Sequence, residues 1–273
     1  MEKFTMIGDV AVHFTDSEKG SNPVLLLHGY MESLDVWEDF RDRLSADGYR
    51  VITMDIPGHG ISEVLGETHT MEMMADVAVK LLDKLKIERA NVIGHSMGGY
   101  VALAMAKKYP GKMLSLTLFS STPNADTEEK KENRRREIEI VASGRKEMLS
   151  KVLPGKGFAP ANRKRMQDEI DWMALQVMLT EDEGIMALLR GMMEREDMNG
   201  MLKESKVPQL FLFGKKDEYI TIETAEEVAM NNSQAKVAWL EESGHNGFLE
   251  QPEESVRIVE EFIGKPSTDA DQE

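Results

Sequence analysis

Ser96 is the residue whose neighbours most clearly predict a chemical reaction. It lies in the run Gly94-His95-Ser96-Met97-Gly98-Gly99, which follows the apolar residues 92–93 and precedes a helical pattern. The bare Gly-x-Ser-x-Gly spacing is weak evidence, since it arises by chance in roughly one chain in ten. Where a strand, a sharp turn and a helix meet, the same spacing exposes the serine hydroxyl and needs small residues on both sides. The sequence therefore predicts Ser96 as a nucleophile.

His245 is the histidine placed to activate that serine. A serine hydroxyl is a poor nucleophile at neutral pH, so it needs a base within hydrogen-bond reach and an acid that orients the base. In hydrolases that carry their serine on such a turn, the acid and the histidine follow the serine along the chain. Of the six histidines, only His245 lies after Ser96, in a loop that follows the apolar run 235–240. We predict His245 as the general base.

Asp217 is the predicted acid. It follows the strand-like run 208–214 after a short turn, at the end of a strand, where ligand chemistry collects in open α/β sheets. Asp126, which follows the run 114–119, is an alternative acid, and Glu218 is a weaker one because it is displaced by one residue. A turn or capping role is the structural alternative for Asp217.

Strand-like runs and helical patterns alternate along the chain and would position these residues. Strands are predicted at 10–15, 24–27, 51–54, 91–94, 114–119, 208–214 and 235–240, and helices at 71–86, 100–109 and 252–263. The first strand alternates like an edge strand, whereas the next two are apolar enough to be buried on both faces. This order predicts an α/β fold with a mostly parallel sheet flanked by helices.

The stretch 123–206 interrupts this alternation. It has no strand-like run and is rich in charged residues and methionine, so we expect a helical cap inserted into a sheet domain made of 1–122 and 207–265. A chain of 273 residues is long enough for one core with such an insertion. The last residues, 266–273, have nothing to bury and are expected to be disordered.

The cap carries an unusual charge. Residues 130–165 contain twelve Lys or Arg and four Glu, a net charge of +8, in a chain whose net charge is -16. The usual reason for such a run is a solvated helix face. The alternative is that the segment steers an anionic substrate or docks on an acidic surface. The cap methionines are expected to pack between helices, and their flexible thioethers also suit a pocket that adapts to different acyl chains.

Four segments together resemble the α/β-hydrolase superfamily, in its capped branch of small esterases, meta-cleavage C–C hydrolases, haloperoxidase-like enzymes and lipase-like hydrolases. They are 27–30 (Leu-His-Gly-Tyr), 55–62 (Asp-Ile-Pro-Gly-His-Gly-Ile-Ser), 94–99 and 214–217, followed by Gly244-His245. The resemblance implies an oxyanion hole made by the backbone amides of Tyr30 and Met97, and a cap that covers the pocket. Members with an aspartate nucleophile are disfavoured by Ser96, and meta-cleavage hydrolases usually have asparagine where this chain has His95.

Five further side chains are candidate pocket residues: His28, His95, Phe158, Trp172 and Phe248. For most of them core packing is the structural alternative, and Phe248 has the better claim because it lies three residues after His245. His28 and His59 are not spaced as metal ligands, so structural roles are favoured for both.

Composition narrows the partners. A net charge of -16 repels phosphate backbones and anionic membranes, so nucleic acid is an unexpected partner. The absence of cysteine excludes disulfides and thiolate metal sites. No signal-peptide pattern opens the chain and the apolar runs are far shorter than about 18 residues, so we expect a cytoplasmic protein without stable membrane insertion. A monomer or a homodimer without metal, nucleotide or redox cofactor is expected.

These residues predict hydrolysis of a small-molecule carboxylic ester through an acyl-enzyme, a carboxylesterase-type reaction. Hydrolysis of a C–C bond or a thioester is an alternative, because the same three residues serve those reactions. A hypothesis from another class is a ligand-sensing receptor that keeps the fold and uses the capped pocket for binding.

Overall fold

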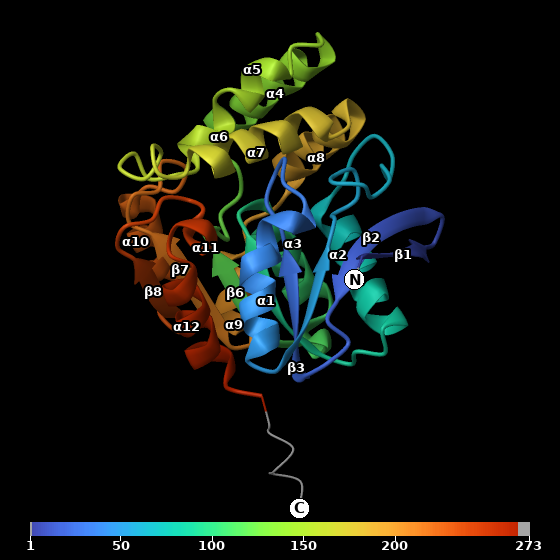
Figure 1. Ribbon diagram of the computed structural model, residues 1–273, viewed down its shortest axis with the longest axis vertical. Helices are drawn as coiled ribbons and strands as arrows, with labels where there is room; N and C mark the ends of the chain where they lie inside the picture. The colour runs from blue at the N-terminus through green and yellow to red at the C-terminus, as the bar shows by residue number, and fades with distance from the viewer. Residues whose placement is uncertain (1, 267–273) are drawn as a thin grey trace, which may run out of the picture.

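The computed structural model of the chain describes residues 2–266, so 267–273 of the predicted disordered tail lie outside the described residues. An eight-stranded sheet runs through the centre of the molecule, in the order β1-β2-β4-β3-β5-β6-β7-β8 (Figure 1). Its strands are β1 (Glu2–Ile7), β2 (Val10–Asp16), β3 (Ser21–Leu27), β4 (Tyr49–Met54), β5 (Ala90–His95), β6 (Met113–Phe119), β7 (Gln209–Gly214) and β8 (Lys236–Leu240). The pairs β1–β2 and β2–β4 are antiparallel and all other pairs are parallel. The predicted α/β class with a mostly parallel sheet is confirmed.

The strand β1 is the main difference from the predicted sheet. It pairs along its length with β2, so β2 is the second strand and its prediction as an edge strand was wrong. Phe4 and Met6 of β1 are 59% and 50% exposed, so the strand lacks the buried apolar run that identifies the central strands. The position of β1 is therefore determined by its pairing with β2 more than by an apolar pattern in its own sequence.

Helices cover both faces of the sheet. One face is packed by α2 (Met71–Lys84), α3 (Met97–Lys108) and α10 (Ile222–Asn231), and the other by α1 (Glu38–Ala46) and α12 (Pro252–Ile263). The short helices η1 (Leu34–Trp37), η2 (Pro110–Lys112) and α11 (Gly247–Glu250) lie in connections. Because both faces are covered, the side chains of Val24, Leu25, Leu26 and Leu27 in β3 are fully buried.

Residues 120–208, between β6 and β7, contain helices and loops but no strand. The helices are α4 (Glu128–Ala142), α5 (Glu147–Ser150), α6 (Leu153–Lys156), α7 (Gln167–Leu179), α8 (Asp182–Glu194) and α9 (Asn199–Glu204). Figure 1 shows α4 to α8 stacked above one end of the sheet, and we name these five the cap helices. By contrast, α9 lies against the core, where the Leu202 carbonyl accepts hydrogen bonds from the side chains of Gln209 (3.0 Å) and Gln234 (3.1 Å).

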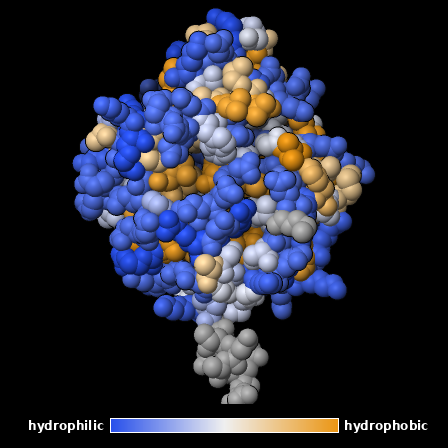
Figure 2. Space-filling view, viewed as in Figure 1, coloured by the Kyte–Doolittle hydropathy of each residue, from blue (hydrophilic) through white to orange (hydrophobic). Residues whose placement is uncertain are grey.

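The surface agrees with the composition. On the face drawn in Figure 2, hydrophilic residues predominate and apolar ones form small patches. Several exposed apolar side chains belong to the cap helices, among them Leu175 and Leu179 of α7. Within 2–266 no helix is both long and apolar enough to cross a lipid bilayer.

Candidate active site

The loops that follow parallel strands bring the predicted residues to one edge of the sheet, beneath the cap helices. Tyr30 follows β3, Ser96 follows β5, Asp217 follows β7 and His245 follows β8. Because these strands run parallel, their carboxyl ends meet at that edge.

Ser96 lies on the sharp turn between β5 and α3. Its backbone has φ 49° and ψ -114°, a strained conformation for a residue with a side chain. The turn is held by the Ser96 amide, which donates to the Phe119 carbonyl (2.9 Å), and by the Ser121 hydroxyl, which donates to the Ser96 carbonyl (2.7 Å). A Cβ on Gly94 would lie 2.3 Å from the Gly98 carbonyl oxygen, so the backbone itself demands a glycine there.

His245 and Asp217 form a buried pair. The His245 Nδ1–H donates to Asp217 Oδ2 at 2.7 Å, while Asp217 Oδ1 accepts from the backbone amides of Tyr219 (2.7 Å) and Ile220 (3.0 Å). Burial alone would lower the pKa of His245, but the charge and hydrogen bond of Asp217 outweigh it. Together with two more distant carboxylates they raise this pKa above its ordinary value of about 6.5.

The two alternative acids have other partners. Asp126 is buried between Arg134, whose Nε lies 2.5 Å from Oδ2, and Arg195, whose guanidinium lies 2.7 Å from Oδ1. Glu218 pairs with Arg163 at 2.6 Å. Of the three carboxylates considered, Asp217 is the one bonded to His245.

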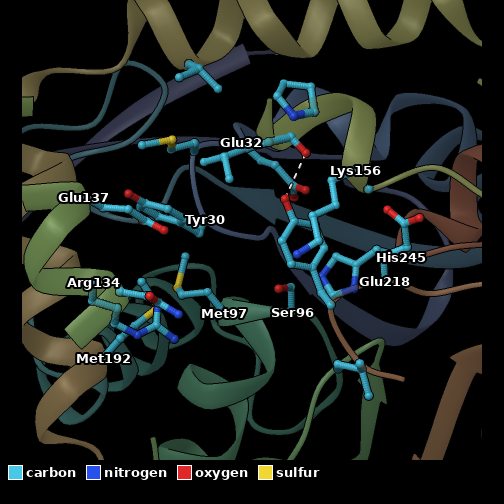
Figure 3. A pocket seen from close by; sticks show the side chains of 18 of the residues that line it. Tyr30, Glu32, Ser96, Met97, Arg134, Glu137, Lys156, Met192, Glu218 and His245 are labelled. Carbon is cyan, nitrogen blue, oxygen red and sulfur yellow. Dashed lines mark hydrogen bonds between the residues drawn. The ribbon is translucent and has the colours of Figure 1, made fainter. Parts of the chain in front are cut away.

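Ser96 and His245 both line a cavity of about 530 Å³ between the sheet edge and the cap helices. Figure 3 shows the two side chains on the core side of this cavity. Tyr30 and Met97, named above for their backbone amides, also line it. In the described part of the chain neither of these amides donates to another residue, and Met97 is the first residue of α3, where helix amides lack an intrahelical acceptor.

A buried network that we did not predict lies directly behind the pair. Glu32 Oε2 accepts hydrogen bonds from the Gly29 amide (2.6 Å) and from His95 Nδ1 (3.1 Å), while His95 Nε2 lies 3.2 Å from the His245 carbonyl oxygen. Each ring nitrogen of His95 thus faces an oxygen atom, one from the Glu32 carboxylate and one from the His245 backbone. Burial by itself would raise the pKa of Glu32, but His95 outweighs it and the pKa is lowered.

This network connects the loop after β3, the end of β5 and the loop after β8. Glu32 holds the loop that carries Tyr30, and His95 holds the loop that carries His245. No sequence pattern marks Glu32, because its role arises only when β3, β5 and β8 are neighbours.

The five predicted pocket side chains do not line the cavity, so that prediction was wrong for His28, His95, Phe158, Trp172 and Phe248. His28 is fully buried, its Nδ1–H donates to the Gly29 carbonyl (2.8 Å) and its Nε2 accepts from the Ile56 amide (2.9 Å).

The three aromatic residues lie behind the cavity wall. Phe248 packs on Trp37 with ring centroids 4.5 Å apart, while Phe158 and Trp172 pack in an apolar cluster with Met173. Large aromatic rings bury more apolar area there than beside a polar cavity. The methionines closer to the cavity are Met173 and Met192, both from the region predicted to supply an adaptable wall.

The basic segment divides into two parts. Lys130, Arg134, Arg136 and Lys156 line the cavity. Other members form ion pairs on the surface, for example Lys151 with Glu147 at 2.6 Å. Some residues of the basic segment are therefore placed to attract an anionic substrate, and others belong to a solvated helix face.

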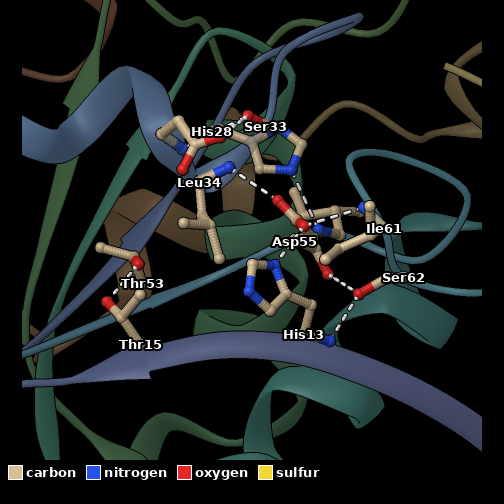
Figure 4. A network of polar contacts seen from close by, with 11 residues as sticks. His13, Thr15, His28, Ser33, Leu34, Thr53, Asp55, Ile61 and Ser62 are labelled. Atoms are coloured by element: carbon tan, nitrogen blue, oxygen red, sulfur yellow. Dashed lines mark hydrogen bonds and ion pairs between the residues drawn. The ribbon is translucent and has the colours of Figure 1, made fainter. Parts of the chain in front are cut away.

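Asp55 organises the loop 55–62 that carries part of the family resemblance (Figure 4). Its carboxylate accepts hydrogen bonds from His13 Nδ1 (2.7 Å) and from the amides of Leu34 (2.7 Å) and Ile61 (3.0 Å). These contacts are structural. Among residues 2–266 no group of three or more His, Asp or Glu side chains is arranged to hold a metal ion.

The cap is bonded to the loop that carries His245. The Gly157 carbonyl accepts from the amides of His245 (2.8 Å) and Asn246 (3.1 Å). Glu250 Oε2 accepts from the amide of Ala159 (2.9 Å) and from the side chain of Asn162 (2.7 Å). The segment after α6 thus forms part of the support of His245.

Comparison with known proteins agrees with this architecture. Residues 22–139 match the family model described as alpha/beta hydrolase fold. The chain is 29% identical to a thermophilic esterase from Thermogutta terrifontis, whose structure was solved with malate bound, with a TM-score of 0.89 over 96% of this chain and 98% of that one. An esterase from Exiguobacterium antarcticum is 24% identical, with a TM-score of 0.85 over 96% and 99% of the two chains, and shows the shared fold.

A curated relative points to another hydrolytic reaction. The 2-hydroxy-6-oxononadienedioate/2-hydroxy-6-oxononatrienedioate hydrolase of Burkholderia vietnamiensis is 27% identical over 93% of this chain and 91% of that protein. The sheet order, the family model and these relatives agree, and on these grounds the chain has the alpha/beta hydrolase fold.

Proposed function

We propose that this chain is a serine hydrolase that cleaves small carboxylic esters, with Ser96 as nucleophile, His245 as general base and Asp217 as the orienting acid. The observation that carries the proposal is the 2.7 Å bond between His245 and Asp217, at a cavity that Ser96 also lines from a strained turn. Strain of this kind persists where the surrounding structure enforces it, which is common at catalytic residues.

The proposed reaction assigns one step to each of these groups. His245 Nε2 takes the proton of the Ser96 hydroxyl as its oxygen attacks the ester carbonyl, and the bond from His245 Nδ1 to Asp217 stabilises the imidazolium. The backbone amides of Tyr30 and Met97 donate to the oxyanion, and each such donor contributes about 2.7–4 kcal/mol to transition-state stabilisation. His245 then protonates the departing alcohol, and a water molecule activated by the same residue releases the acid.

The cavity supports a small substrate. Its volume of about 530 Å³ lies within the range of small-molecule sites. Its walls combine apolar side chains such as Met173, Val177 and Met192 with charged ones from α4. Such a site suits an ester with both apolar and polar parts.

C–C bond hydrolysis is the second candidate. The observation that favours it is the relative from Burkholderia vietnamiensis, which is named for the hydrolysis of a dienedioate. Thioester hydrolysis and ligand sensing with slow turnover draw on the same residues.

Turnover of p-nitrophenyl acetate and butanoate, assayed beside a vinylogous diketone, separates these candidates. We expect ester turnover and covalent labelling of Ser96 by a fluorophosphonate, located by mass spectrometry of the peptide. Ser96→Ala should abolish the label, and Ser143→Ala, which removes an exposed hydroxyl in the cap, should retain it. Faster cleavage of the diketone favours the C–C candidate, labelling without turnover favours a receptor, and undiminished labelling of the Ser96 variant refutes the nucleophile.

A further inference from the structure

Tyr219 lies where the cap meets the pair formed by His245 and Asp217. It follows Asp217 by two residues in the loop between β7 and α10, and it lines the cavity that contains Ser96. Its backbone amide donates to Asp217 Oδ1 at 2.7 Å, and its ring lies against the ring of His245. The same side chain is contacted by α6 of the cap. One residue therefore touches both members of the pair and the element that covers them.

The ring of Tyr219 restricts the movement of the imidazole. Its centroid lies 5.0 Å from that of His245, and the centroid of His95 lies 4.9 Å from it, each ring at a tilt of 59° to His245. A rotation of the imidazole would break the 2.7 Å bond from His245 Nδ1 to Asp217 and would need space that these neighbours occupy. A reactive side chain keeps its productive geometry when packing locks its rotamer. The two neighbouring rings thus hold His245 in the orientation that its bond to Asp217 requires.

Tyr219 also separates the pair from solvent. It is itself 36% exposed, whereas the side chains of His245 and Asp217 are 9% and 1% exposed. Because one part of Tyr219 meets solvent and another part meets His245, its ring covers the imidazole from outside. A hydrogen bond is electrostatically stronger where water is excluded. Loss of this ring would admit water to the bond between His245 and Asp217.

Two contacts connect the same side chain to α6. The Tyr219 hydroxyl donates to the Leu153 carbonyl at 2.9 Å, and the Lys156 ammonium lies 4.5 Å from the centroid of the ring, which attracts it. In Figure 3 Lys156 lies on the side of Ser96 that also holds His245. Burial raises the pKa of the Tyr219 phenol and nearby carboxylates raise it further, so the hydroxyl keeps its proton and remains a donor. The docking of α6 therefore helps to hold the ring in place.

We propose that Tyr219 is a positioning residue that couples the docking of α6 to the orientation of His245. The hydroxyl is bonded to the cap and not directed at the reacting atoms, so Tyr219 acts through His245. This inference rests on the proposed function, in which His245 is the general base. It implies that the base is held in its productive orientation while α6 is docked, and that it becomes loose and hydrated when the ring is lost.

The bond between His245 and Asp217 provides the first test. In proton NMR the Nδ1 proton of such a bond gives a far-downfield signal as long as water does not exchange it rapidly, and His245→Gln identifies the signal by removing it. We expect wild type and Tyr219→Phe to show this signal and Tyr219→Ala to lose it. Tyr100→Ala is the matched control, because it removes another ring that lines the cavity but packs on Arg195 at 3.9 Å. This control should keep the signal.

Turnover of p-nitrophenyl butanoate provides the second test. Tyr219→Ala should lower kcat by about 10- to 100-fold, because the general base is no longer held in position. Tyr219→Phe keeps the ring and should recover most of that loss. A thermal melt shows whether each variant is folded, and Tyr219→Leu, which also lacks the ring, takes the place of Tyr219→Ala if the latter does not fold.

The connection to the cap is tested by hydrogen exchange. Tyr219→Phe removes only the hydroxyl that binds the Leu153 carbonyl, so the amides of α6 should exchange several-fold faster than in the wild type. Mass spectrometry of the peptide that contains 153–156 measures this rate. Tyr100→Phe removes a different phenol from the cavity wall and should leave the rate unchanged.

Any one of four results overturns the proposal. They are a wild type without the downfield signal, a signal equally protected from exchange in wild type and Tyr219→Ala, a kcat as low in Tyr219→Phe as in Tyr219→Ala, and an unchanged exchange rate of α6 in Tyr219→Phe. If the wild type hydrolyses no ester and takes no fluorophosphonate label, the proposed function fails. The NMR and exchange measurements need no turnover, so they still decide whether Tyr219 connects the cap to the pair.

Discussion

The two walls of the cavity are built in different ways. On the core wall, Asp217, His245 and Glu32 are buried. Asp217 is bonded to His245 at 2.7 Å, and Glu32 is connected through His95 to the His245 backbone by contacts of 3.1 and 3.2 Å. On the cap wall, α4 has Val141 as its one buried residue and presents charged side chains that pair mainly with their neighbours along the helix or in the cap. We infer that the core wall determines the reaction, because its groups cannot move independently, and that the cap wall determines which substrate is accepted.

Removing the nucleophile is the most direct way to break this comparison. Ser96→Ala should reduce kcat by on the order of 10⁶-fold, the scale found when the serine of a catalytic triad is removed. Binding of a product acid should survive, because the cap wall is unchanged. Steady-state kinetics with p-nitrophenyl butanoate and calorimetry of acid binding measure the two effects. A variant that keeps more than a hundredth of the activity would contradict the assignment.

Replacing Asp217 tests a residue of the core wall that acts on the reaction through His245. Asp217→Asn should reduce kcat by about 10⁴-fold, because His245 loses the anion that orients it and stabilises its cation. Asp126→Asn, at the alternative acid, is the control and should cost far less, since Asp126 binds the guanidinium groups of Arg134 and Arg195. Equal losses in the two variants would refute the choice of Asp217.

The pH profile of the Asp217→Asn variant should shift in a defined direction. In the proposed reaction the neutral form of His245 is the base, so kcat/KM should rise with pH through its pKa, which Asp217 helps to raise above about 6.5. Asp217→Asn removes that charge, and the acid limb of the residual activity should therefore move to lower pH. An unchanged or upward shift would show that another group controls the limb.

Glu32 offers a smaller perturbation of the core wall. Glu32→Gln removes the carboxylate that contacts His95 Nδ1 and the Gly29 amide, so the loops of Tyr30 and His245 should shift and kcat should fall by about 10- to 100-fold. The acid limb should also move to lower pH, because the Glu32 charge helps to raise the pKa of His245. Glu218→Gln, a cavity carboxylate that pairs with Arg163, is the matched control. A purely structural role for Glu32 would lower the melting temperature without moving the limb.

The smallest expected effect concerns the cap wall. Raising the ionic strength from about 0.01 M to about 0.15 M shortens the screening length from about 30 Å to about 8 Å. If the net charge of +8 over 130–165 steers anions, kcat/KM for an anionic ester should fall by a few fold over that range, and for a neutral ester it should not. If kcat/KM for both esters is independent of ionic strength, the basic residues of 130–165 serve only as a solvated surface.

Features that repeat along the chain were predictable from the sequence. The seven predicted strands correspond to β2–β8. The strands of the parallel part were recognisable by their apolar runs, and the antiparallel β2 by its alternating pattern. The turn at Ser96 was recognisable because Gly94 is required by a backbone contact with the nearby Gly98, although Gly98 is itself required by the backbone of Leu27 in the neighbouring strand. Asp217 and His245 were recognisable because they follow strands.

Features that depend on how side chains turn were not predictable. The bonds from Glu32 to His95 and from His95 to the His245 loop join residues far apart in the sequence. The aromatic residues expected in the pocket turn away from it, while Tyr30 and Glu137 turn toward it. No periodicity encodes that choice, because it depends on the space left by neighbouring elements.

The Gly157 carbonyl, which binds the amides of His245 and Asn246, has a consequence for the way a substrate enters. A motion that lifted the whole cap away as a rigid lid would break these bonds and release the general base from its backbone support. Opening and chemical competence are therefore thermodynamically opposed at this point of the chain. A substrate can therefore reach Ser96 without disturbing His245 only by a route that leaves the segment from Gly157 to Asn162 docked.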